Sequence, residues 1–142
     1  MIDLRKITAL ALLCALAAAA SAAGRGNALS SYTGSFEAGG QVSLRLSPGG
    51  GNVSHISIDG ITAECRRGSA TLDYNIDGGT PVLEDRSFAV RSRDGKAKAF
   101  VKGRFSSDYE SVKGAARVHG KIFAGKPRCD SERQKFKGKV SR

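Results

Sequence analysis

Apolar and polar residues alternate along most of the chain after residue 24, and glycine interrupts the alternation about every ten residues. Alternation with a period of two is typical of strands that bury one face. Apolar residues do not recur at helical spacing over any long stretch of this part of the sequence. The pattern therefore predicts an all-β fold, a single antiparallel β-sandwich or short β-barrel of about eight to ten strands.

The alternation also predicts which residues point into the core. In chain order they are Val42, Leu44 and Leu46; Ile56 and Ile58; Ile61, Ala63 and Cys65; Ala70, Leu72, Tyr74 and Ile76; Phe88 and Val90; Ala97, Ala99, Val101, Gly103 and Phe105; Val112, Gly114, Ala116 and Val118; and Phe136, Gly138 and Val140. The Asp-Gly pairs at 59–60 and 94–95 predict two-residue hairpin turns. Glycine and proline predict a turn at 48–52 and the end of a strand at 77–81.

The first residues of the chain have the three parts of a secretory signal. Arg5 and Lys6 precede an apolar run of about a dozen residues, and small residues at 20–22 complete the cleavage pattern. The run is shorter than the roughly 20 residues that a spanning helix needs. We therefore expect a cleaved signal peptide rather than a transmembrane anchor, and a secreted, periplasmic or otherwise extracytoplasmic protein.

This assignment divides the chain into three parts. Residues 1–22 form the predicted signal peptide, residues 23–30 a flexible leader, and residues 31–142 a single β domain. The length of the last part suits one domain.

Removal of the signal peptide leaves two cysteines, Cys65 and Cys129, which allow only one connectivity. Such a pair is expected to oxidise outside the cytoplasm. A metal site would need three or four ligands, and neither His55 nor His119 stands at ligand spacing from a cysteine. The sequence therefore predicts a Cys65–Cys129 disulfide, with no metal and no cofactor.

Charge is distributed unevenly along the chain, whose formal net charge is +10. Residues 23–85 contain four basic and seven acidic residues, whereas residues 86–142 contain 17 basic and five acidic residues. This asymmetry predicts a basic surface that attracts anions, provided that the fold does not interleave the two halves.

Strand alternation places many of these cations on outward faces. Along the last strand, lysines occupy every second position, about 6–7 Å apart on one face. The candidate binding residues of this basic sheet surface are Lys96, Lys98, Lys102, Arg104, Lys113, Arg117, Lys135, Lys137 and Lys139. One interpretation is a binding surface for an anionic envelope polymer or lipid surface. The other is that the lysines keep a soluble β protein monomeric by resisting strand-to-strand aggregation.

Two further partner classes follow from the same pattern. Nucleic acid is disfavoured because Phe100 is the only outward ring among the cation rows, so bases would find few side chains to stack on. A protein partner is the alternative, bound in the manner of an inhibitor through the loops at 49–52 or 106–111.

The sequence contains no motif for catalysis that we recognise. His55 follows Ser54 and His119 precedes Gly120, each within a strand pattern, and no Gly-x-Ser-x-Gly elbow is present. The acidic pairs at 84–85 and 108/110 lie in stretches typical of turns. We therefore predict a non-enzymatic protein.

Part of the chain resembles a loose group of small exported bacterial β-rich proteins. The segment 81–88 ends a turn with a phenylalanine, Val-Lys-Gly-Arg-Phe follows at 101–105 and Val-Lys-Gly at 112–114. A cysteine at 129, matched by an earlier one at 65, then precedes a final strand with an aromatic residue. Phe136 stands where the group commonly has tryptophan. The resemblance covers most of residues 32–140 and implies the fold and export, but no activity.

Overall fold

The computed structural model describes residues 29–121 and 128–141, so the predicted signal peptide lies outside the described residues. Within these ranges the chain forms nine β-strands and one short 3₁₀ turn, η2. The elements are β1 (Ser30–Phe36), β2 (Gln41–Leu46), η2 (Pro48–Gly50), β3 (Asn52–Cys65), β4 (Gly68–Pro81), β5 (Ser87–Asp94), β6 (Ala97–Phe105), β7 (Ser111–Gly120), β8 (Cys129–Asp130) and β9 (Gln134–Ser141). Ser30 therefore belongs to the first strand rather than to a leader.

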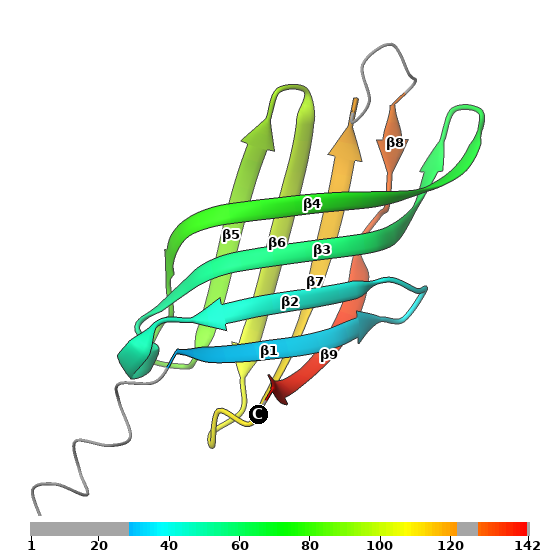
Figure 1. The fold of residues 1–142 in the computed structure, drawn as a ribbon. Helices are drawn as coiled ribbons and strands as arrows, with labels where there is room; N and C mark the ends of the chain where they lie inside the picture. Colours follow the sequence, from blue (N-terminus) through cyan, green and yellow to red (C-terminus); the bar gives the residue numbers. More distant parts are fainter. Residues whose placement is uncertain (1–28, 122–127, 142) are drawn as a thin grey trace, which may run out of the picture.

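The strands form an antiparallel sheet in the order β4-β3-β2-β1-β9-β7-β6-β5. The short strand β8 pairs with both β3 and β7, which closes six strands into a barrel. Strand β4 extends the sheet beyond β3, and strands β6 and β5 extend it beyond β7 (Figure 1). The predicted all-β fold class is confirmed. Because six strands close on themselves, the fold is a barrel.

The two halves of the sequence occupy different sides of this barrel. Strands β1 to β4 form one layer, and β5, β6, β7 and β9 form the other. In Figure 1, β1 to β4 run across the front and cross the strands of the second layer at a steep angle. The halves are not interleaved, which meets the condition on which the predicted basic surface depended.

The core lies between the two layers and contains the inward residues that the alternation predicts, all of them buried or half-buried. Strand β1, which the pattern did not identify, adds Tyr32 and Phe36. The ring centroids of Tyr32 and Phe105 are 5.0 Å apart, and those of Phe88 and Phe105 are 5.5 Å apart. Aromatic contacts of this kind compensate for the absence of tryptophan in the chain.

Two glycines in neighbouring strands leave space for phenylalanine rings. Gly103 lies directly opposite Gly114, and the flanking partners in the same row are Phe88 and Phe136. A Cβ atom on Gly114 would lie 2.2 Å from the carbonyl oxygen of Lys102 and 2.6 Å from the Phe136 ring. Only glycine fits between these strands while the ring of Phe136 stays in the core.

The hairpin predicted at Asp59-Gly60 is wrong, because β3 continues through both residues to Cys65. Gly60 has a φ of 69°, and the register with β4 shifts between Ile58 and Ile61. The N–H of Gly60 donates a hydrogen bond of 2.7 Å to Oδ1 of Asp73. A glycine with positive φ forms a β-bulge as readily as a turn, and here it forms the bulge.

The strand end predicted at 77–81 is confirmed, since β4 ends at Pro81, although a bulge interrupts its pairing before that residue. Gly78, with a φ of 107°, lies where the register with β3 shifts between Val53 and His55. The turn predicted at Asp94-Gly95 is confirmed, since β5 ends at Asp94 and β6 begins at Ala97.

A disulfide joins Cys65 of β3 to Cys129 of β8, which are directly opposite each other in the pairing. The predicted pairing is confirmed, and a disulfide indicates an oxidising environment. The bond lies where β8 closes the barrel. In the ranges that the structure describes, none of the helical segments has the length and hydrophobicity to cross a membrane.

Candidate anion-binding site

The outer surface of β5, β6, β7 and β9 carries most of the predicted binding residues, and we call it the basic face. Its exposed or half-buried cations in strands are Lys98, Lys102, Arg104, Lys113, Arg117, Lys135, Lys137 and Lys139. The predicted residue Lys96 lies in the turn between β5 and β6 instead of in the strand. The structure thus brings eight of the nine candidates onto one sheet surface and places the ninth at its end.

Cations lie directly opposite one another across these strands. Arg104 is opposite Lys113, and Lys113 is opposite Lys137. The Cβ atoms of such cross-strand neighbours are about 4.5–5.5 Å apart. The cations therefore form rows across the sheet as well as along each strand.

Two arginines of the basic face were not among the predicted binding residues. Arg91 and Arg93 are exposed on β5, opposite Phe100 and Lys98 of β6. The inward positions of this strand had been predicted correctly, so the same alternation would have identified the outward arginines. His119 of β7 lies opposite Lys98 and extends the row.

Two cations of the basic face are neutralised by carboxylates. Arg104 contacts Asp85 at 3.1 Å, and Arg117 holds Asp130 through two hydrogen bonds of 3.0 and 2.5 Å. The hydrogen bond from Arg117 lowers the pKa of Asp130, and the same bond raises the pKa of Arg117. In contrast, Arg93, Lys98 and the lysines of β9 form no ion pair within the described residues.

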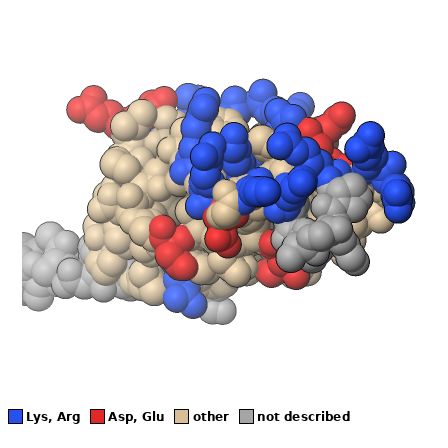
Figure 2. Space-filling view, turned by 90° about the horizontal axis from the view of Figure 1, so that it is seen from above, with Lys and Arg blue, Asp and Glu red and all other residues tan. Residues whose placement is uncertain are grey.

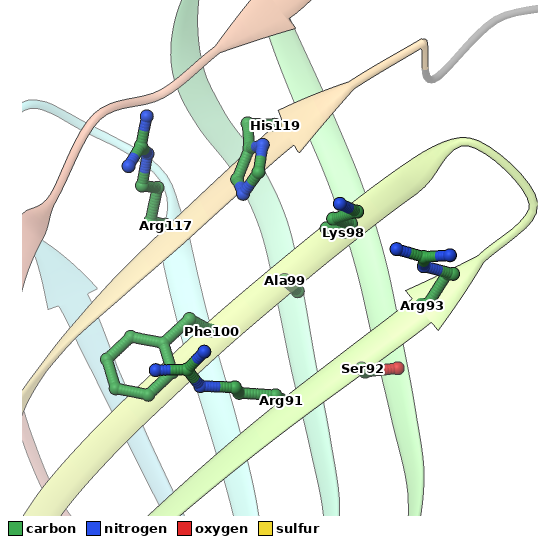
Figure 3. A pocket seen from close by; sticks show the side chains of 8 residues that line it. All are labelled: Arg91, Ser92, Arg93, Lys98, Ala99, Phe100, Arg117 and His119. Carbon is green, nitrogen blue, oxygen red and sulfur yellow. The ribbon is translucent and has the colours of Figure 1, made fainter.

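A hollow of about 470 Å³ opens on the basic face near the turn between β5 and β6. Its charged and aromatic lining consists of Arg91, Arg93, Lys98, Phe100, Arg117 and His119. In Figure 3, the Arg91 guanidinium lies over the Phe100 ring, while Lys98 and His119 stand across the hollow from it. The Cζ atom of Arg91 is 5.3 Å from the ring centroid, a distance typical of a cation–π contact.

A second hollow, of about 490 Å³, follows the first along β6. Small residues, among them Ala89 and Ala115, lie at its base, and Lys102, Lys113 and Lys135 are among the cations that line it. Outward alanines are much shorter than the lysines beside them. The basic face therefore has hollows and is not flat.

The loops proposed for a protein partner lie together at one end of the barrel. A Cβ atom on Gly50 would be 3.9 Å from the Tyr109 ring, which places η2 beside the loop at 106–110. The hydroxyl of Tyr32 donates a hydrogen bond of 2.6 Å to the carbonyl oxygen of Tyr109. Burial, followed by the charge of Glu110, raises the pKa of Tyr32. This end of the barrel is therefore fixed to the core.

Asp85, Asp108 and His55, three of the residues considered for catalysis, have structural partners. Asp85 accepts hydrogen bonds from Ser87 and Asp108 accepts one from Ser106, and these bonds lower the pKa of each carboxyl group. A general acid of a glycosidase needs a raised pKa, so neither carboxyl group suits that role. His55 contacts Asp77 at 2.6 Å on the outside of β3 and β4. Across the two described ranges, no three His, Cys, Asp or Glu residues are grouped so as to hold a metal ion.

Comparisons with known proteins do not add to this description. The chain matches no protein family, no curated protein and no solved structure. The functional argument therefore rests on the geometry and charge of the basic face.

Proposed function

We propose that the protein is a secreted or envelope-associated, non-enzymatic protein that binds an anionic polymer or surface through its basic face. The observation that carries this proposal is the placement of like charges directly opposite one another. Arg93 faces Lys98, and Lys113 faces Lys137, and none of these four cations forms an ion pair within the described residues.

Such an arrangement costs stability in the free protein. Like charges directly opposite in an antiparallel pair are destabilising. Two unit charges about 5 Å apart would repel by about 0.8 kcal/mol in water; this is an upper bound for each pair, because long side chains can separate their charged groups further than their Cβ atoms and salt screens part of the repulsion. A polyanion laid over the rows would replace this repulsion with attraction. Lysines that served solubility alone would gain nothing from being opposite one another.

The separation of charge between the two layers supports the same proposal. Residues 30–81, which form β1 to β4, contain three basic and five acidic residues, a net charge of −2. In the view of Figure 2, Lys and Arg gather over one part of the visible surface. A protein polarised in this way approaches an anionic surface with one side first.

The test compares binding of two charge-reversal variants to anionic envelope glycans, anionic vesicles and neutral controls. The first variant changes Lys135, Lys137 and Lys139 to Glu. The matched control changes Arg45, Arg66 and Arg67 to Glu, which alters the net charge equally on exposed residues away from the basic face. We expect the first variant to lose binding and the control to retain most of it. DNA is included as a disfavoured polyanion.

The salt dependence provides a second measurement. Affinity of the unmodified protein should fall about tenfold or more between about 50 and 200 mM salt, because several cations contact the polymer at once. Binding that is unchanged over this range, or equal binding by both variants, would show that the lysines serve solubility and not recognition.

The second candidate is a protein-binding module that acts through η2 and the loop at 106–110. The observation that favours it is the contact of both loops at one end of the barrel. It predicts binding to a protein partner that tolerates salt, persists in the lysine variant and is lost when the loop at 106–110 is changed.

A further inference from the structure

The hollow near the turn between β5 and β6 differs from the rest of the basic face because one of its cations is held in place. Phe100 is half-buried on β6, and Arg91 lies directly opposite it on β5. The guanidinium of Arg91 lies over the ring at 5.3 Å from its centroid (Figure 3). An exposed arginine normally samples many rotamers, and stacking on a ring restricts them.

The side chain of Arg91 makes no hydrogen bond within the described residues, so its N–H donors are not used by the contact with the ring. These N–H groups lie in the plane of the guanidinium and point outward from its edge. Arg91 forms no ion pair within the described residues. The edge of a fixed guanidinium is well suited to bind two oxygens of one oxyanion.

The remaining charges of the hollow indicate which oxyanion it suits. Arg93 and Lys98 lie opposite each other and form no ion pair in the part of the chain that the structure describes, whereas Arg117 is neutralised by Asp130. The hollow thus contains three uncompensated cations, with His119 beside them. A phosphomonoester carries close to two negative charges at neutral pH and three acceptor oxygens, while a carboxylate carries one charge and two oxygens.

We propose that the hollow between Arg91 and His119 is a binding site for a phosphomonoester group, in which Arg91, positioned by Phe100, and the adjacent Arg93 and Lys98 hold the phosphate oxygens. This inference rests on the proposed function, since it names the anionic group that the basic face recognises. The lysines of β9 supply additional, less specific attraction for the polymer or surface that carries the group.

The test measures binding of glucose 6-phosphate by calorimetry, and follows the arginine side-chain Nε–H signals by NMR. Glucuronate serves as the carboxylate probe and inorganic phosphate as the smallest probe. The main variant is Arg91→Lys, which preserves the charge but removes the planar donor edge. The control is Lys137→Gln, which removes a charge from the basic face outside the hollow.

We expect Arg91→Lys to weaken glucose 6-phosphate binding about tenfold. Phe100→Leu, which keeps every charge, should weaken it about two- to fivefold. Lys137→Gln should remain within about twofold of the unmodified protein. Glucuronate should bind at least about fivefold more weakly than glucose 6-phosphate, because it carries less charge.

Two results would overturn the proposal. Equal affinity of Arg91→Lys and the unmodified protein would show that phosphate is only a diffuse counterion. Equal affinity for glucuronate and glucose 6-phosphate would show that the site does not select phosphate. Neither result affects the proposed function, because Arg91→Lys leaves the charge of the basic face unchanged and polymer binding is measured separately.

A further arm distinguishes the source of the phosphate group. Phosphatidylcholine vesicles with and without phosphatidic acid are offered to the protein, and glucose 6-phosphate is added as a competitor. Competitive displacement from the phosphatidic acid vesicles supports the site and identifies a lipid headgroup as one source. Saturable binding of glucose 6-phosphate without binding to these vesicles supports the site and identifies a phosphorylated glycan or other soluble phosphate.

Discussion

The glycine row in the second layer provides a sharp test of how closely the strands pack. Gly114→Ala adds one methyl group between β7 and β6. Its Cβ atom would lie 2.2 Å from the carbonyl oxygen of Lys102 and 2.6 Å from the Phe136 ring, so strands or ring must move. Phe136 is only 1% exposed, and its ring centroid lies 5.7 Å from that of Phe36, so the ring has little free space.

The expected cost follows from these contacts. Overpacking a well-packed core costs about 1–3 kcal/mol, and a clash with backbone lies at the upper end. Alanine restricts the unfolded chain more than glycine does, and this effect offsets about 0.4–1 kcal/mol of the overpacking cost. We therefore expect Gly114→Ala to lower the free energy of unfolding by about 2 kcal/mol. For a domain of this size that corresponds to a fall of about 8 °C in Tm.

Thermal unfolding followed by circular dichroism measures this change. The control is Gly51→Ala, because Gly51 has a φ of −79° and a Cβ atom there would meet nothing within 4 Å. Its Tm should equal or slightly exceed that of the unmodified protein. If Gly114→Ala unfolded within about 2 °C of the control, the close approach of β6 and β7 would not limit stability.

Two further predictions concern the disulfide and the carboxylates. Replacing both Cys65 and Cys129 with Ser should lower the free energy of unfolding by about 4 kcal/mol, because the bond closes a loop with a sequence separation of 64. Urea unfolding without reductant measures this, and two free thiols in the secreted protein would contradict the pairing. Stability should fall as pH drops through about 4, since the folded-state pKa of Asp130 is below its ordinary value of 3.8 and the unfolded chain binds the proton first. Asp130→Asn should make unfolding less dependent on pH below about 5, and an unchanged dependence would exclude Asp130 as a contributor.

The inward rows of the strands were predictable because burial of one face imposes a period of two on the sequence. Phe105, Val112 and Ile58 all fall on such rows and are at most 1% exposed. Strand β1 was not predicted because the residues between Tyr32 and Phe36 are small polar residues and one glycine, which do not show the alternation of apolar and polar positions. Its place between β2 and β9 depends on pairing with residues about 100 positions away, as Tyr32 opposite Val140 illustrates.

The Asp-Gly pairs at 59–60 and 94–95 show why turns and bulges could not be separated in advance. At 94–95 the segments on either side pair with each other, whereas at 59–60 both segments pair with the same strand, β4. The glycine has a positive φ in both places, 59° at Gly95 and 69° at Gly60. The dipeptide specifies the local backbone, but the choice of partner strand decides between the two outcomes.

Of the candidate site, the cation rows were predictable from alternation and charge alone. The stacking of Arg91 on Phe100 was not, because it depends on the register between β5 and β6. The ion pair between Arg117 and Asp130 depends likewise on the position of β8, a strand of only two residues.

The sorting of charge by layer has a consequence for what the protein does to the surface it occupies. A protein with cations on every side can link two anionic surfaces and draw them together. Here the cation rows lie on the second layer, and residues 30–81, which form the first, carry a net charge of −2. Under the proposed function, a bound copy turns this weakly negative layer toward the solution. The protein would then coat a single anionic surface without cross-linking it to another, and the coated surface would keep its original sign.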